Sequence, residues 1–338
     1  MTDLLQRYHQ LLQPSAALVA DMVKLTGDIL ILGAGGKMGP ALATLAKQAV
    51  DASGKPRKVI AVSRFTDEAA RDSLNVIGVE TISADLQNEQ DLNNLPLAEN
   101  VLYLAGTKFG TKGREWATWA MNAYLPGRVA EKYRHSRIVV FSSGNIYPFT
   151  PVADGGADEA IAAQPVGEYA QSVLGRERIF QHFSYQYNTP ILIYRLNYAN
   201  DVSYGVLLEI AKAVNVGQPV NLAMGNVNVI WQGDANDMAL RSLLHCSTPP
   251  KLLNITGPET VSVKWAATQF AKLLHKPVSF TGEPHSTALL NNAAASFGLF
   301  GYPQVTLTQM MQLIADWLLQ GGATINKETH FQEREGQY

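Results

Sequence analysis

The feature that most constrains the fold is an apolar run, residues 28–32, that leads directly into closely spaced glycines and then into a helix-like segment. Gly33 permits a tight turn after the strand, and Gly39 lets the following helix lie close to it. Gly35 or Gly36 lets backbone amides approach a pyrophosphate, and the start of the helix-like segment adds the positive end of the helix dipole. The pattern therefore predicts a dinucleotide-binding turn; the alternative is a glycine-rich turn without a ligand.

Short runs rich in β-branched residues recur along the first two thirds of the chain, separated by segments long enough for helices. The predicted strands are residues 28–32, 58–62, 79–83, 101–105, 137–141 and 190–194. This alternation predicts a parallel sheet covered on both faces, and right-handed crossovers make it doubly wound. We therefore expect an α/β protein with a doubly wound (Rossmann) sheet of six or seven strands.

The chain divides into four predicted parts. Residues 1–27 are amphipathic and predict an N-terminal helical extension, and residues 28–201 predict the dinucleotide-binding domain. Beyond these, residues 202–320 mainly form a smaller, interleaved substrate-binding lobe, and residues 321–338 form a polar tail that we expect to be loosely held. With 338 residues and 46% hydrophobic content, the chain can bury a full core.

Composition excludes several classes of partner. A net charge of −2 gives no basic surface for nucleic acid or an anionic membrane, so a small-molecule substrate is expected. No run of 18 apolar residues and no export signal is visible, which predicts a cytoplasmic protein without a membrane span. The single cysteine, Cys246, excludes an internal disulfide, and the seven histidines lack metal-ligand spacing, so no metal site is predicted.

Several motifs follow one another along residues 28–320. They are Gly33-x-x-Gly36-x-x-Gly39, Leu104-Ala105-Gly106, Asn122, the run Phe141–Pro148, Tyr169, Arg195–Tyr198 and Asn254–Glu259. In this combination and order the chain resembles the extended short-chain dehydrogenase/reductase family, the NAD-dependent epimerase/dehydratase group that commonly acts on nucleotide sugars. The resemblance implies an oxidoreductase or epimerase/dehydratase acting on a sugar-like alcohol, and a homodimer.

The resemblance also implies site residues. Ser143 would hydrogen-bond the substrate oxygen, and Tyr169 would act as general acid or base while hydride passes to or from the nicotinamide. Asn197 would face the substrate, although an asparagine that stabilises a loop is equally plausible, and Tyr169 could be an ordinary residue at a helix start. Between Val202 and Gly257 only three residues are basic, so a free sugar or sugar acid fits at least as well as a nucleotide sugar.

One position departs from the family pattern. The lysine that the family places four residues after the tyrosine is Val173 here. At roughly 7 Å and an effective dielectric near 20, such a lysine contributes about 2 kcal/mol to ionising the tyrosine. Another cation, Arg176, Lys108 or Lys112, could substitute, or the chemistry could depend less on the tyrosine. The third alternative is a weakly active or inactive dinucleotide-binding protein that acts as a redox sensor or interaction module.

The end of the second predicted strand bears on the choice of cofactor. NAD enzymes of this fold place an acidic residue there, but this chain has Ser63 and Arg64. A serine leaves room for a 2′-phosphate and an arginine matches its oxygens, so NADP(H) is favoured over NAD(H). Asp85 would contact adenine or cap a helix. The predicted cofactor-binding residues are Gly33, Gly35, Gly36, Lys37, Met38, Gly39, Ser63, Arg64, Asp85, Leu104, Ala105 and Gly106.

Overall fold

The computed structural model describes residues 2–110, 112–325 and 329–337, so residues 326–328 and 338 of the predicted tail lie outside it. Within these residues a seven-stranded parallel sheet has the order β12-β7-β5-β4-β1-β2-β3. The strands are β1 (Ile29–Leu32), β2 (Val59–Ser63), β3 (Glu80–Ser83), β4 (Asn100–Tyr103), β5 (Arg137–Ser143), β7 (Ile191–Leu196) and β12 (Lys251–Ile255). The strand order reverses at β1, between β2 and β4, which is where ligands bind in open sheets of this type. The predicted doubly wound fold is confirmed.

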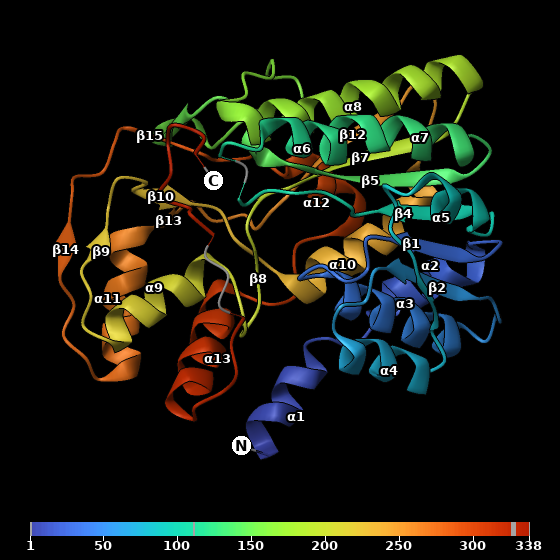
Figure 1. Ribbon diagram of the computed structural model, residues 1–338. Helices are drawn as coiled ribbons and strands as arrows, with labels where there is room; N and C mark the ends of the chain where they lie inside the picture. Colours follow the sequence, from blue (N-terminus) through green and yellow to red (C-terminus); the bar gives the residue numbers. More distant parts are fainter. Residues whose placement is uncertain (1, 111, 326–328, 338) are drawn as a thin grey trace.

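Helices cover both faces of the sheet (Figure 1). Ile29 and Ile31 of β1 pack on one face, and Leu30 and Leu32 pack on the other, all without exposed surface. This two-sided burial explains why the strand is apolar throughout. The first face is covered by α2 (Ala16–Lys24), α3 (Gly39–Ser53) and α10 (Gln232–Arg241), with α4 (Glu68–Val76) beside α3. The second face is covered by α5 (Glu89–Asn94), α7 (Leu125–Lys132) and α8 (Gly167–Tyr187).

The smaller lobe lies to the left of the sheet in Figure 1 and has its own buried core. Its helices are α9 (Val206–Asn215), α11 (Val263–Leu274) and α13 (Leu307–Leu319). Short strands pair beside them: β9 (Val220–Asn221) with β14 (Phe280–Thr281), and β10 (Asn226–Val227) with β13 (Val261–Ser262). Between these segments the chain returns to the sheet as α10 and β12.

The remaining elements are short. Their bounds are α6 (Glu115–Trp119), α12 (Ala294–Phe300), β6 (Thr150–Pro151), β8 (Ala199–Asn200), β11 (Ile230–Trp231), β15 (Thr287–Ala288), a π-helical turn at Ala120–Tyr124, and 3₁₀ turns at Gly144–Ile146, Val152–Asp154 and Ser242–His245. No helix among the described residues combines the length and apolar character that crossing a bilayer requires.

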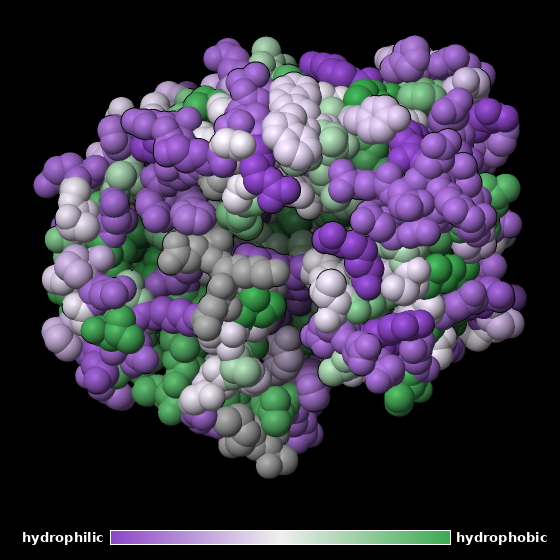
Figure 2. Space-filling model, in the orientation of Figure 1, coloured by the Kyte–Doolittle hydropathy of each residue, from purple (hydrophilic) through white to green (hydrophobic). Residues whose placement is uncertain are grey.

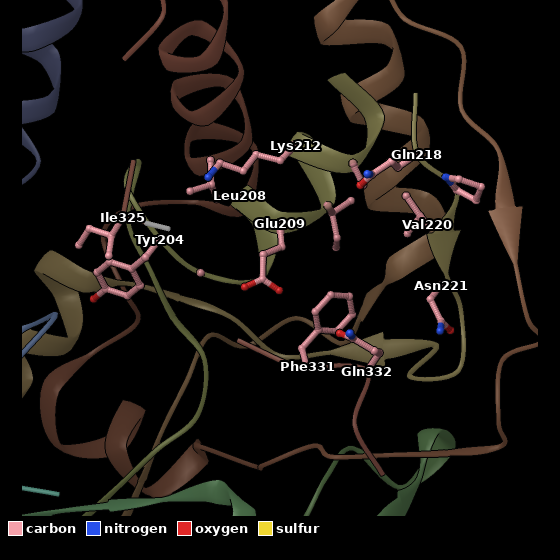
Figure 3. Close-up of a pocket in the computed structure, with 14 residues that line it drawn as sticks. Tyr204, Leu208, Glu209, Lys212, Gln218, Val220, Asn221, Ile325, Phe331 and Gln332 are labelled. Carbon is pink, nitrogen blue, oxygen red and sulfur yellow. The ribbon is translucent and has the colours of Figure 1, made fainter. Parts of the chain in front are cut away.

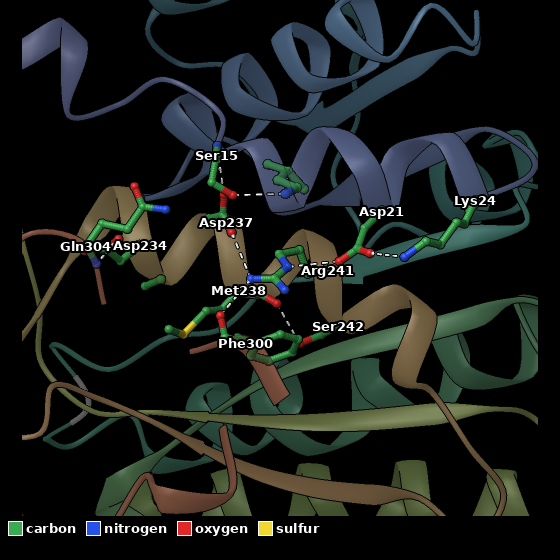
Figure 4. Close-up of polar contacts among 12 residues, drawn as sticks. Ser15, Asp21, Lys24, Asp234, Asp237, Met238, Arg241, Ser242, Phe300 and Gln304 are labelled. Atoms are coloured by element: carbon green, nitrogen blue, oxygen red, sulfur yellow. Dashed lines mark hydrogen bonds and ion pairs between the residues drawn. The ribbon is translucent and has the colours of Figure 1, made fainter. Parts of the chain in front are cut away.

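The N-terminal extension consists of two helices that contact different parts of the molecule. α1 (Thr2–Gln10) packs on α13 of the smaller lobe, where Arg7 and Asp316 form an ion pair of 3.2 Å. α2 packs on the sheet side, where Asp21 pairs with Arg241 of α10 at 2.9 Å (Figure 4). The extension therefore spans both lobes.

The C-terminal tail differs from its expected loose state. Phe331 is only 6% exposed and belongs to the core of the smaller lobe. Thr329 donates a hydrogen bond of 2.7 Å from Oγ1 to Glu209, and Arg334 donates to the carbonyl oxygen and hydroxyl of Thr287 at 2.8 and 2.7 Å. One buried aromatic ring and a few specific hydrogen bonds hold this segment, and its polar composition does not reveal them.

Candidate active site

The glycine turn has distinct steric requirements at each position. Gly33 has φ +92°, and a Cβ built on it would lie 2.6 Å from the backbone nitrogen of Ala105. A Cβ on Gly39 would lie 2.6 Å from Cα of Ala34, so the helix can approach the strand only with glycine there. At Gly36 the nearest atom would be 3.6 Å away. Packing within the chain therefore does not require this glycine, and its exposed backbone leaves room for a bound group.

The start of α3 faces the same turn. Met38 stands at the N-cap position, and its side chain makes no capping hydrogen bond. Met38 therefore offers no side-chain acceptor to the first backbone N–H groups of α3, which form the positive end of the helix dipole. The Lys37 ammonium lies 5.4 Å from the centre of the Phe109 ring and 5.5 Å from that of Tyr204. Lys37 therefore connects the turn to the segment after β4 and to the smaller lobe.

The predicted adenosine side lies at the end of β2. Gly35 abuts the hydroxyl of Ser63 so closely that a Cβ would collide with it, and Arg64 is exposed beside it. The carboxylate of Asp85 accepts the backbone amide two residues later at 3.0 Å. The helix-cap alternative for Asp85 is wrong, because α5 begins after Asn88, whose side chain accepts two backbone amides. The structure thus brings the turn and the end of β2 together.

The predicted catalytic pair lies where the carboxyl end of β5, with Ser143, meets the start of α8, with Tyr169. Ser143 is 9% exposed, and its hydroxyl accepts the Asn145 amide at 3.1 Å. The Ser143 side chain also hydrogen-bonds Tyr169 near the start of α8. Burial raises the pKa of Tyr169, and the charge of Arg176 and the bond with Ser143 lower it in part. The two residues are therefore close enough to act on one substrate oxygen.

Asn122 connects the end of β4 with α8. It lies in the π-helical turn, is completely buried, and its Oδ1 accepts the Thr107 amide and Nη2 of Arg176, both at 2.9 Å. Its Nδ2 donates to the Thr107 carbonyl at 2.8 Å and to the Ser172 hydroxyl at 3.0 Å. π-Helical turns frequently occur at functional sites. This residue positions the segment after β4 against the helix that carries the catalytic tyrosine.

The segment after β4 contacts the glycine turn on one side and a cation on the other. Leu104 donates its amide to the carbonyl of Leu32 at 2.8 Å, and Ala105 packs on Gly33. A Cβ on Gly106 would collide with Nη2 of Arg176. The predicted residues of this segment therefore lie between the turn and α8.

Two of the three candidate cations lie near Tyr169. Val173, at the family's lysine position, is buried in a small apolar cluster. Arg176 lies one turn further along α8, and its charge acts on Tyr169. The Lys108 ammonium lies 5.5 Å from the centre of the Tyr169 ring, and burial followed by the Lys37 charge lowers the pKa of Lys108 to about 8. The third candidate, Lys112, is exposed.

Asn197 follows β7 and is 2% exposed. A Cβ built on Gly144, the residue after Ser143, would lie 3.1 Å from the Cβ of Asn197. The structure therefore places the predicted substrate residue beside the predicted catalytic serine. A second asparagine, Asn291, meets the same glycine, and sequence reasoning missed it, because nothing in its local pattern marks contact with a residue so far away along the chain.

The face of the molecule is hollowed between the sheet and the smaller lobe (Figure 2). A pocket of about 500 Å³ opens in the smaller lobe, where Glu209, Lys212 and Gln332 line it (Figure 3). Tyr204 lines the same pocket and also contacts Lys37 of the glycine turn. The pocket thus adjoins the turn. Among the described residues no cluster of three acidic, histidine or cysteine side chains could hold a metal ion.

The fold and this site define a dinucleotide-binding enzyme of the Rossmann class. A family model, the NAD dependent epimerase/dehydratase family, matches residues 29–225. The chain therefore belongs to the NAD-dependent epimerase/dehydratase family of enzymes, which confirms the resemblance of its motifs. The family depends on a nicotinamide dinucleotide, and the glycine turn, with its exposed backbone at Gly36, fits such a group. No curated protein matches the chain.

Solved structures show the same fold. UDP-glucuronic acid 4-epimerase from Bacillus cereus, in complex with UDP-glucuronic acid and NAD, has a TM-score of 0.72 at 17% identity over 87% of this chain and 99% of that chain. UDP-glucose 4-epimerase from Thermus thermophilus, in complex with NAD, has a TM-score of 0.70 at 16% identity over 86% of this chain and 98% of that chain. Both structures contain NAD, so these likenesses do not support the predicted preference for NADP.

Proposed function

We propose that the protein is a cytoplasmic NAD(P)-dependent oxidoreductase or epimerase/dehydratase that acts on a sugar-like alcohol: a sugar, a sugar acid or a nucleotide sugar. The main support is the proximity of Ser143, at the carboxyl end of β5, to Tyr169, near the start of α8. Bound nicotinamide dinucleotide supplies hydride transfer in this chemistry. Ser143 orients the substrate hydroxyl, and Tyr169 takes or returns its proton. An inactive redox sensor is not supported by the family or by the solved structures.

Arg176 replaces the family's lysine in this proposal. Arg176 is 5% exposed, and its guanidinium donates to the carbonyl of Phe141 at 2.7 Å and to Oδ1 of Asn122 at 2.9 Å. These bonds fix a permanent positive charge whose effect is to lower the pKa of Tyr169 against the effect of burial. Lys108, above the Tyr169 ring, adds a second cation.

The acid–base assignment is tested with Tyr169→Phe. Initial rates with D-glucuronate, UDP-glucose and UDP-glucuronate, each with NAD or NADP, identify a substrate for the wild-type protein. The variant should then lose about 10²- to 10⁴-fold in rate, because a phenyl ring cannot carry the proton. Binding of the dinucleotide, followed by nicotinamide fluorescence, should remain. A variant as fast as the wild type would show that Tyr169 is not the acid or base.

The preference for NADP(H) over NAD(H) remains part of the proposal. Ser63 is small and half-buried at the end of β2, and the exposed Arg64 offers a guanidinium within reach of a 2′-phosphate. Arg64→Ala should weaken NADPH binding about tenfold or more and leave NADH binding nearly unchanged, because only NADPH carries the extra charge. An equal loss for both would exclude a phosphate contact.

We also propose a homodimer. Trp116, Trp119 and Tyr124 are exposed on α6 and the π-helical turn, beside α8. These aromatic side chains are suited to an interface between two copies of the chain. Light scattering of the purified protein at micromolar concentration tests this, and a monomeric mass would contradict it.

A further inference from the structure

Two buried asparagine side chains lie beside Ser143 and carry amide atoms that have no hydrogen-bond partner among the described residues. Asn197 and Asn291 are each 2% exposed. Among the described residues, Nδ2 of Asn197 and both Nδ2 and Oδ1 of Asn291 have no hydrogen-bond partner. A Cβ built on Gly144 would lie 2.6 Å from Oδ1 of Asn291, so both asparagines lie against the residue that follows Ser143.

The backbone, rather than the amide groups, holds these side chains in place. The backbone N–H of Asn291 donates to Oδ1 of Asn228 at 2.8 Å, and the backbone of Asn291 forms a β-bridge with Ala157. The backbone N–H of Asn197 donates to the carbonyl of Ile255 at 2.9 Å. A buried unpaired polar group costs about 1–3 kcal/mol. The side-chain amide of Asn291 and the Nδ2 group of Asn197 therefore add no hydrogen bond that stabilises the fold, and each requires another explanation.

The location of Asn197 and Asn291 explains their unpaired amide atoms. Gly144 and Asn197 follow β5 and β7 at the carboxyl ends of adjacent strands, where parallel sheets of this type bind their ligands. Ser143, immediately before Gly144, hydrogen-bonds Tyr169. The unpaired amides thus lie next to the position at which the proposed reaction occurs.

We propose that Asn291, beside the already predicted Asn197, recognises a hydroxyl group of the substrate that neighbours the reacting hydroxyl. The amide of Asn291 offers an acceptor and two N–H donors, which suits a hydroxyl that both donates and accepts, and Asn197 offers further donors. The substrate class is accordingly a ring or chain with adjacent hydroxyl groups. This inference rests on the proposed function, and it adds a specificity determinant that lies outside the catalytic pair.

The first test uses the stability of the substrate-free protein. Asn291→Leu keeps a similar volume and removes the unpaired polar atoms, so its melting temperature should equal or exceed that of the wild type. The matched control is Asn254→Leu. Asn254 is also completely buried, but it accepts the Tyr147 hydroxyl at 2.9 Å and donates to the Ala157 carbonyl at 2.9 Å, so this variant should melt lower. If Asn291→Leu loses as much stability as Asn254→Leu, Asn291 is structural and the inference is wrong.

The second test measures binding by isothermal titration calorimetry of the NADH-loaded protein with D-glucuronate, UDP-glucose and UDP-glucuronate. A compound that binds the wild type should bind Asn291→Leu at least tenfold more weakly, while NADH affinity changes less than about twofold. Equal binding to both proteins would refute the role of Asn291 and leave the proposed function intact. If none of the compounds binds the wild type, the proposed sugar-like substrate is wrong, and the inference fails with it.

Discussion

The buried ion pair between Glu177 and Arg195 permits a quantitative prediction. Glu177 has no exposed surface and Arg195 is 4% exposed. Nη2 of Arg195 lies 2.8 Å from Oε2 of Glu177, and Nε lies 3.0 Å from Oε1. Burial alone would lower the pKa of Arg195, but the bonds to Glu177 raise it, so the guanidinium keeps its charge. Glu177→Gln removes the counter-charge and leaves that cation buried.

The expected loss follows from the burial of both groups. Removing one partner of a buried pair costs about 3–5 kcal/mol. With an unfolding entropy of about 2.1 cal/mol/K per residue, the whole chain unfolds with about 0.7 kcal/mol/K. The melting temperature of Glu177→Gln should therefore fall by about 4–7 °C, measured by differential scanning calorimetry at pH 7.

The chain contains a matched surface pair. Lys58 and Glu80 are 3.3 Å apart, and both side chains are largely exposed. Exposed pairs contribute about 0–1 kcal/mol, so Glu80→Gln should shift the melting temperature by less than about 1.5 °C. Equal shifts for Glu177→Gln and Glu80→Gln would refute the argument that burial makes the Glu177 pair important.

Three further predictions follow from described contacts. Where Tyr169 acts as the base, Arg176→Met should lower kcat/KM at pH 7 at least tenfold and move the ascending limb of the rate profile to higher pH, because less of the tyrosine is deprotonated. Arg176→Lys should restore most of the rate, and an unchanged limb in Arg176→Met would contradict the proposed charge effect. Gly36→Ala should weaken dinucleotide binding at a nearly unchanged melting temperature, whereas Gly39→Ala should lower the melting temperature. A larger fall in melting temperature for Gly36→Ala than for Gly39→Ala would refute the steric assignment. Burial raises the pKa of Asp234 to about 6, so its contribution to stability is full below its ordinary value of 3.8 and is lost as the pH rises through about 6. Asp234→Asn should remove this dependence, and parallel melting curves of the two proteins across that range would contradict it.

The central strands were predictable from the sequence because their burial on both faces demands continuous apolar runs, as in β1. The seventh strand, β12, was missed as a strand. Its first two residues are only half-buried, and it follows segments of the smaller lobe, so neither its composition nor its place in the chain marks it as part of the sheet. Residues that are distant in sequence become neighbours there through pairing with β7.

The candidate site was predictable only where local motifs or the family resemblance mark a residue. Ser143 and Tyr169 fall into this group, as does the glycine turn. Asn291 could not be found in this way, because an unpaired amide is defined by the contacts of the folded chain and not by neighbouring residues. The same holds for Arg334 in the tail, whose hydrogen-bond partner Thr287 belongs to β15.

The N-terminal extension has a consequence for substrate entry. Tyr8 of α1 donates a hydrogen bond to Asp201 at 3.0 Å, and the indole of the completely buried Trp231 donates to the carbonyl of Leu11 at 2.9 Å. α2 follows only a few residues later and packs on the sheet side. We therefore expect the N-terminal extension to oppose hinge rotation of one lobe against the other. We therefore expect a substrate to reach the hollow between the lobes through local movement of surface segments, and deletion of residues 1–24 should loosen the whole molecule rather than merely shorten it.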